Sequence, residues 1–165
     1  MINEFGEVLE KENLKKYSTL GIGGTCKYLV KPDSLVHLIG LINYLKEKDI
    51  KYVILGNCSN VIIDDTYFDG VVIMLTKFNN LEISNNKVKV GAGVPLGLLN
   101  KKCLDEGYTN LTFLGMIPGN VGGSIVGNAG CYNHEIMEYV ESVKVLDKEG
   151  NVKELLKKDM SFGYD

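Results

Sequence analysis

The stretch that decides the fold runs from Phe113 to Tyr132 and reads FLGMIPGNVGGSIVGNAGCY. Glycine recurs there at positions 115, 119, 122, 123, 127 and 130, but the other residues are too varied for a low-complexity segment. Glycine loses more conformational freedom on folding than any other residue, so such a cluster needs a reason, such as positive φ angles or a close ligand. The stretch therefore predicts a site where a ligand lies against the main chain.

A second glycine turn follows an apolar run. Tyr52 to Leu55 reads as a buried strand, and Gly56-Asn57-Cys58-Ser59-Asn60 comes directly after it. Backbone N–H groups in a turn of small residues at a strand end converge on anions. We interpret this turn as a pyrophosphate loop in which the backbone and the Ser59 hydroxyl donate hydrogen bonds; the alternative is a plain turn between strands.

The basic residues restrict how a phosphate is held. All 18 basic side chains are lysine, and the chain has no arginine. The bidentate guanidinium fork is therefore not available, and a phosphate must be held by backbone N–H groups, by Ser, Thr or Asn side chains, or by lysine charges.

Bulk composition is that of an ordinary globular chain. The 165 residues are 45% hydrophobic and 24% charged, with a net charge of -3, which gives no reason to expect nucleic acid as a partner. The N-terminus lacks the features of a signal peptide, and no apolar run approaches membrane-span length. We expect a cytoplasmic protein without a membrane partner.

Cysteine and histidine do not suggest a metal site. The four cysteines, at 26, 58, 103 and 131, lack metal-knuckle spacing, so we expect reduced, packed thiols. A Cys58 or Cys131 that is reactive or covalently attached to a ligand is the alternative, but neither has a Lys or His beside it in sequence to lower its pKa. We interpret His134 as a solvated turn residue.

Periodicity indicates an α+β chain. Ile2, Phe5 and Leu9 are spaced as in a short amphipathic helix over 2–12, and Ser34 is placed to cap a helix starting at Leu35. Strands are expected at 26–30, 52–55 and 70–75, hairpins at 81–90 and 140–156, and helices from Pro95 to about 107 and after Gly119. We expect a small βαβ lobe over 1–75 and a mixed-sheet lobe over 76–165, with the ligand in the crevice between them.

One further glycine pattern does not fit a dinucleotide site. Gly91-Ala92-Gly93-Val94-Pro95-Leu96-Gly97 has the wrong spacing and follows a hairpin instead of opening a βαβ unit. We therefore reject a Rossmann fold.

Several motifs in register resemble the FAD-binding part of UDP-N-acetylenolpyruvoylglucosamine reductases, flavoenzymes of peptidoglycan synthesis. The motifs are 17–24 (YSTLGIGG), 55–60 with Asp64, 117–123 (IPGNVGG), 128–132 (NAGCY) and 162–164 (FGY). The resemblance implies a two-lobed FAD-binding fold of the PCMH/VAO type, FAD as cofactor and NADPH as co-substrate. The cofactor-binding residues it implies are Gly56, Asn57, Cys58, Ser59, Asn60, Met116, Ile117, Pro118, Gly119, Asn120, Gly122, Gly123, Asn128, Ala129 and Tyr132.

The chain also departs from the family pattern. Cys58, Met116 and Asn133 stand where the family usually has glycine, and Asp165 stands where it has an arginine that contacts substrate. Tyr132 and Tyr164 are candidate contacts to flavin or substrate; the alternative is that they are half-buried aromatic residues with solvated hydroxyls. The family's downstream substrate domain, with its serine proton donor and a glutamate, is absent from this sequence. We therefore expect an FAD-binding domain that takes a UDP-sugar substrate only if the missing domain is supplied. The alternatives are a non-catalytic flavin or nucleotide module, and a remnant without cofactor.

Overall fold

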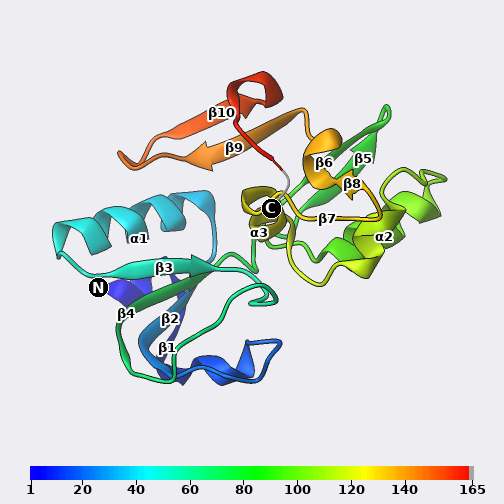
Figure 1. The fold of residues 1–165 in the computed structure, drawn as a ribbon. Coiled ribbons are helices and arrows are strands. Elements are labelled where there is room, and N and C mark those ends of the chain that lie inside the picture. Colours follow the sequence, from blue (N-terminus) through cyan, green and yellow to red (C-terminus); the bar gives the residue numbers. More distant parts are fainter. Residues whose placement is uncertain (164–165) are drawn as a thin grey trace.

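A four-stranded mixed sheet forms the first half of the computed structural model, which describes residues 1–163. Its strands lie in the order β1 (Gly6–Asn13), β2 (Thr25–Pro32), β4 (Phe68–Met74) and β3 (Tyr52–Leu55) (Figure 1). β1 pairs antiparallel with β2, whereas β2 and β3 both pair parallel with β4. The expected β2-helix-β3 unit is present, with β4 inserted between its two strands.

The N-terminal helix prediction was wrong. Only Ile2–Phe5 forms a 3₁₀ turn, and β1 begins at Gly6. Val8 packs with the cluster on one face of the sheet and Leu9 with the cluster on the other. Pairing with the free edge of β2 therefore overrides a helical spacing of only three apolar residues.

Helix α1 (Leu35–Glu47) covers one face of the sheet, and its N-cap is Ser34, whose side chain accepts the His37 N–H as expected. The core under it consists of Val30, Leu38, Leu41, Ile42, Leu45, Val71 and Ile73. The opposite face is closed by the 3₁₀ turn Leu14–Lys16 and by loop residues that include Tyr17 and Ile63. β3 is an edge strand and was expected to be buried, but the side chain of Ile54 is 50% exposed.

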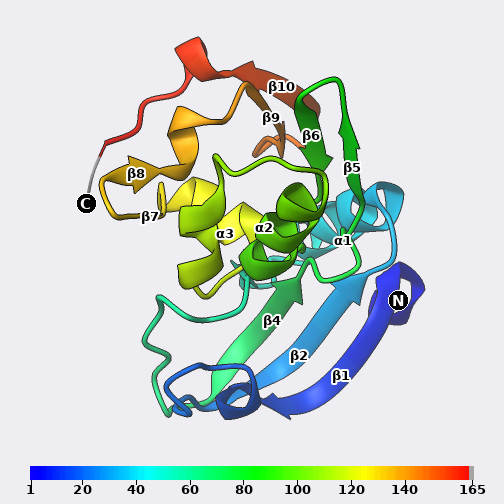
Figure 2. The same cartoon turned by 90° about the vertical axis from the view of Figure 1, so that its right-hand side faces the viewer.

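The second half contains helices and three separate hairpins where we expected a mixed sheet. The helices are α2 (Leu96–Asp105) and α3 (Val121–Val126), and a 3₁₀ turn spans Thr112–Met116. The hairpins are β5 (Leu81–Ser84) with β6 (Lys87–Val90), β7 (Gly130–Cys131) with β8 (His134–Glu135), and β9 (Ser142–Leu146) with β10 (Val152–Leu156). Two further 3₁₀ turns span Ile136–Glu138 and Lys157–Asp159. In Figure 2 these elements lie above β1, β2 and β4.

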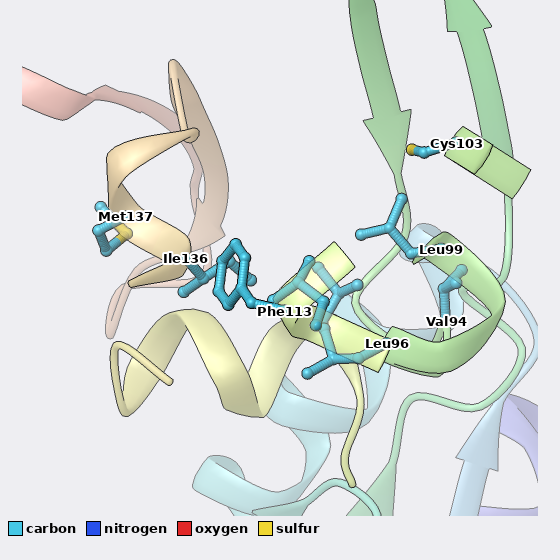
Figure 3. Close-up of a cluster of buried hydrophobic side chains, with 9 residues drawn as sticks. Val94, Leu96, Leu99, Cys103, Phe113, Ile136 and Met137 are labelled. Carbon is cyan, nitrogen blue, oxygen red and sulfur yellow. The ribbon is translucent and has the colours of Figure 1, made fainter. Parts of the chain in front are cut away.

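A separate hydrophobic core holds the second half together. It consists of Val94, Leu96, Leu99, Cys103, Phe113, Leu114, Val121, Ile136 and Met137, most of which Figure 3 labels. Three of these residues, Phe113, Leu114 and Val121, lie within the glycine-rich stretch, so packing fixes the path of a segment that is poor in side chains of its own.

Candidate flavin site

The loop after β3 leaves its backbone donors free. Within residues 1–163, no protein acceptor pairs with the N–H groups of Asn57 to Asn60. The loop is held from the other side, because the Thr19 N–H donates to the carbonyl of Cys58 at 3.3 Å. Four adjacent free N–H groups at the carboxyl end of a parallel strand are suited to an anion.

The glycine-rich stretch lies against this loop. The Ser59 hydroxyl donates to the carbonyl of Pro118 at 2.8 Å. On the other side, the Leu96 N–H donates to the carbonyl of Gly119 at 2.9 Å. The two sequence motifs therefore meet, as expected, but the Ser59 proton is directed at Pro118 instead of an open site.

A pocket of about 410 Å³ opens where the two segments meet. It is lined by Asn57, Pro95, Gly97, Gly115, Met116, Ile117, Pro118, Gly119 and Asn120. None of these residues is ionisable, so a ligand in this pocket meets only backbone groups, amides and apolar side chains. Six of the lining residues are among those expected from the sequence.

Pro95, Gly97 and Gly115 line the pocket but were not expected there. Pro95 and Gly97 come from the segment that we had interpreted as a strand end and helix start. The sequence signal for this wall was a glycine in the first turn of a predicted helix, where glycine is unfavourable. The structure shows that packing does not require it, because a Cβ on Gly97 would meet no atom within 4 Å.

Two neighbouring glycines of α3 serve different purposes. A Cβ on Gly122 would lie 2.9 Å from the Cβ of Ala92, so Gly122 is needed for packing. A Cβ on Gly123 would meet no atom within 4 Å, and within the described chain the Gly123 N–H has no protein acceptor. Gly123 therefore presents bare backbone to open space, which is the arrangement that close ligand approach requires.

Gly119 is constrained by its backbone. Its φ of +144° lies in a region that L side chains rarely adopt, and a Cβ there would come within 3.3 Å of the Ser59 Oγ. Glycine is thus required here by conformation as well as by space.

The side chain of Asn128 is fully engaged with protein. Its Nδ2 donates to Glu135 Oε2 at 2.5 Å and to the Gly163 carbonyl at 3.0 Å, and its Oδ1 accepts the Met137 N–H at 3.3 Å. Ala129 likewise uses its N–H and C=O in bonds to Ser124 and Ile136. These two residues shape the segment, and Asn128 has no amide hydrogen left for a ligand.

A strained turn presents Tyr132. Tyr132 and Asn133 join β7 to β8 with φ angles of +53° and +63°, the pattern of a type I′ turn. The other hairpin of this kind turns at Asn85 and Asn86 with φ angles of +50° and +61°. Asparagine tolerates this conformation, whereas a bulky aromatic residue does not. Tyr132 is 74% exposed, so no protein packing explains its presence.

Two of the three departures from glycine fall at left-handed positions. Cys58 has φ of +49°, which strains a residue that carries this side chain, and Asn133 has φ of +63°, which asparagine tolerates. Met116 has ordinary φ and is 68% exposed on the pocket wall, so it narrows the site without straining the backbone. Burial raises the pKa of the Cys58 thiol above its usual value, which makes it a packing residue and not a nucleophile.

His134 lies in β8 with its Nδ1 3.2 Å from Glu138 Oε2, half exposed. Tyr164 and Asp165 lie outside the described residues, so their substrate contacts stay predictions. Residues 1–163 contain no cluster of His, Cys, Asp and Glu arranged to hold a metal. None of the helices in that range combines the length and hydropathy needed to span a bilayer.

Comparison with known proteins defines the class. Residues 26–156 match the family model described as FAD binding domain, and the chain belongs to that family. FAD is therefore its cofactor, and the PCMH/VAO-type fold expected from the sequence is confirmed.

Individual relatives point to one kind of FAD-binding enzyme. UDP-N-acetylenolpyruvoylglucosamine reductase of Caldicellulosiruptor saccharolyticus is 38% identical over 158 residues, which is 96% of this chain and 51% of that protein. The crystal structure of UDP-N-acetylenolpyruvylglucosamine reductase from Thermus caldophilus has a TM-score of 0.79 at 30% identity, over 96% of this chain and 55% of the other. The resemblance read from the motifs is confirmed.

A more distant structure shares the fold alone. 6-Hydroxy-D-nicotine oxidase from Arthrobacter nicotinovorans has a TM-score of 0.68 at 15% identity, over 93% of this chain and 36% of the other. The present chain spans about half the length of the curated reductases it matches.

Proposed function

We propose that this chain is the FAD-binding half of a reductase that converts UDP-N-acetylglucosamine enolpyruvate to UDP-N-acetylmuramate with NADPH. The observation that carries the proposal is the meeting of the Asn57–Asn60 loop with the Pro118–Gly123 segment around an uncharged pocket. The identity to such reductases over nearly the whole chain supports the reaction class.

FAD fits these residues. The free N–H groups of Asn57 to Asn60 suit its pyrophosphate, which must be held without arginine. The bare backbone at Gly123 suits a flat ring system, and the exposed side chains of Met116 and Tyr132 are available for apolar contact. Held by these residues, FAD would supply the hydride-transfer chemistry between NADPH and the enolpyruvyl group.

The protein's part in this half is binding and orientation. The Ser59–Pro118 bond holds the two segments in register, and the packed Gly122 fixes α3 so that Gly123 faces the ligand. Substrate binding and proton donation belong to the half of the relatives' length that this chain does not match. We therefore propose that the UDP-sugar is bound only when that half is supplied.

A second candidate is a flavin-binding module without turnover. Asp165 in place of the family's arginine favours this second candidate, because a carboxylate repels the substrate's own negative charges and the chain contains no arginine to replace it. The absence of turnover in this chain alone does not separate the two candidates, but rescue by the second half of a relative does.

The lobe boundary and compartment complete the proposal. We keep the division near residue 75, supported by a sheet that ends at Met74 and by separate hydrophobic clusters before and after it. We also propose a cytoplasmic location, which four unpaired thiols fit because disulfides are rare in reducing compartments.

The test has two stages. Titration of the purified chain with FAD is expected to give a flavin spectrum that co-purifies with the protein and a melting temperature that rises with FAD concentration. Stopped-flow mixing with NADPH and then with the enolpyruvyl substrate is expected to show substrate-dependent reoxidation only after addition of the second half of the Caldicellulosiruptor reductase. A chain that neither retains nor is stabilised by FAD would overturn the proposal, and reoxidation by substrate without the second half would show that one half suffices.

A further inference from the structure

The position of Asn128 joins two parts of the molecule that are distant in sequence. It follows α3 at the end of the glycine-rich stretch, and it bonds to Gly163, 35 residues later. Its φ of +43° is left-handed, which asparagine tolerates better than other side-chain-bearing residues.

The orientation of the amide follows from its partners. The Met137 N–H can only donate, so it must face Oδ1; the Gly163 carbonyl can only accept, so it must face Nδ2. The second Nδ2 hydrogen points at the Glu135 carboxylate. Each amide group therefore has a fixed protein partner, and the side chain forms a clamp between the flavin segment, β8 and the C-terminal segment.

The C-terminal segment Met160–Gly163 has few other attachments. Met160 packs against the second core at one end, and the Lys157 ammonium lies 5.8 Å from the centre of the Phe162 ring. Phe162 itself is 43% exposed. The bond from Asn128 is the one side-chain hydrogen bond to Gly163 among the described residues.

We propose that Asn128 is a positioning residue that couples flavin binding to the docking of the segment Met160–Gly163. This inference rests on the proposed function, since the ligand that orders the glycine-rich stretch is FAD. A ligand that holds the backbone at Gly119 to Gly123 also fixes the end of α3, where Asn128 begins its turn. By linkage, docking of Gly163 then strengthens flavin binding by the same factor.

Proteolysis reads this coupling directly. Chymotrypsin cuts after Phe162 only when the Phe162–Gly163 peptide leaves the protein surface, which requires the Gly163 carbonyl to leave Asn128. The product ending at Phe162 is quantified by mass spectrometry, with and without saturating FAD. In the parent, FAD is expected to slow this cleavage at least about 5-fold, the low end of measured couplings.

The variant Asn128→Asp isolates the clamp. Aspartate has nearly the same shape and keeps an acceptor for the Met137 N–H, but it places an oxygen against the Gly163 carbonyl and the Glu135 carboxylate. Cleavage without FAD is expected to be at least about 5-fold faster than in the parent, and FAD is expected to change it less than about 2-fold. FAD affinity is measured in the same samples so that saturation is assured.

The matched control is Lys157→Ala, which removes the cation beside the Phe162 ring and the hydrogen bond from Lys157 to the Glu138 carbonyl but leaves the three hydrogen bonds of the Asn128 side chain with their partners. It is expected to speed cleavage while keeping the FAD effect of the parent. Equal rates for parent and Asn128→Asp without FAD would overturn the clamp. The coupling would be overturned if FAD protected Asn128→Asp from cleavage as fully as the parent, or if saturating FAD did not protect the parent. A parent that binds no FAD would instead overturn the proposed function. In that case the cleavage rates without FAD still decide whether Asn128 holds Gly163.

Discussion

The Ser59 hydroxyl donates a hydrogen bond of 2.8 Å to the carbonyl of Pro118, and this bond joins two glycine-rich segments that are 59 residues apart. It holds the free N–H groups of the loop at a fixed distance from the bare backbone of α3. The register of the site therefore depends on one side chain.

Replacing Ser59 with alanine is expected to lower the free energy of unfolding by about 0.5–1.5 kcal/mol and to weaken FAD binding. The control is Ser124→Ala, which removes a hydroxyl bonded to the Asn120 carbonyl within its own helix and should affect stability alone. Urea unfolding and flavin fluorescence titration measure both quantities. Unchanged FAD affinity in Ser59→Ala would mean that the segments keep their register without this bond.

The two central glycines of α3 should respond with opposite signs. Gly123→Ala adds a methyl group in open space, so we expect the protein without FAD to be more stable by about 0.5–1 kcal/mol and its FAD affinity to fall. Gly122→Ala forces a clash with Ala92 and should destabilise by roughly 1–3 kcal/mol. Thermal melts with and without FAD distinguish the two. If Gly123→Ala binds FAD as the parent does, the ligand does not contact this face.

FAD affinity should depend little on salt. The pocket walls carry no ionisable side chain, so a pyrophosphate bound there would meet only neutral donors, and ionic screening would have little to weaken. We expect the dissociation constant to change less than about 2-fold between about 50 mM and 500 mM NaCl. Gly97→Lys, which places a cation on the pocket wall, is expected to introduce a salt dependence. A steep dependence in the parent would point to lysines outside the pocket.

Tyr132→Asn should stabilise the protein and impair its ligand site. The substitution gives the β7–β8 turn the same Asn-Asn pair as the β5–β6 turn, and relieving a left-handed aromatic residue should add up to about 1 kcal/mol to the free energy of unfolding. If Tyr132 contacts flavin, FAD binding weakens at the same time. Calorimetry gives both values, and a stabilised variant with parental affinity would remove Tyr132 from the site.

Cys58 should be unreactive near neutral pH, and the flavin should be held without a covalent bond. Because burial raises the pKa of this thiol above its ordinary value, alkylation should be slower than that of an exposed cysteine and should accelerate only at alkaline pH. Iodoacetamide labelling across pH 7 to 10, read by peptide mass spectrometry, tests this. Flavin that stays with acid-precipitated protein would contradict it.

Much of this architecture could be predicted because its signals are local. Residues 81–90 were expected to form a hairpin and Ser34 to cap a helix, and both predictions are confirmed. The glycine pattern predicts the ligand site, which stays a prediction. The edge position of β3 could not be predicted, since strand order follows from which edges remain free after folding. The same competition turned the expected helix around Leu9 into β1.

At the candidate site, too, local sequence signals predict some features, and tertiary contacts set the others. The motifs indicated which segments approach the ligand, but not which glycine of the pair 122 and 123 packs and which faces outward, because that depends on Ala92 across the interface. Nor does the sequence indicate that the Asn128 side-chain amide is fully hydrogen-bonded to Glu135, Met137 and Gly163. Both facts are set by tertiary neighbours that are distant in the chain.

All four strands of the sheet lie between residues 6 and 74, which has a consequence during synthesis. This part can complete its strand pairing as soon as it leaves the ribosome, but Pro118 is made 44 residues after Met74, roughly 2–9 s later at typical translation rates. The nascent chain thus completes the loop proposed to bind the pyrophosphate before the segment proposed to complete the site is made, so we expect the cofactor to be captured late in biogenesis.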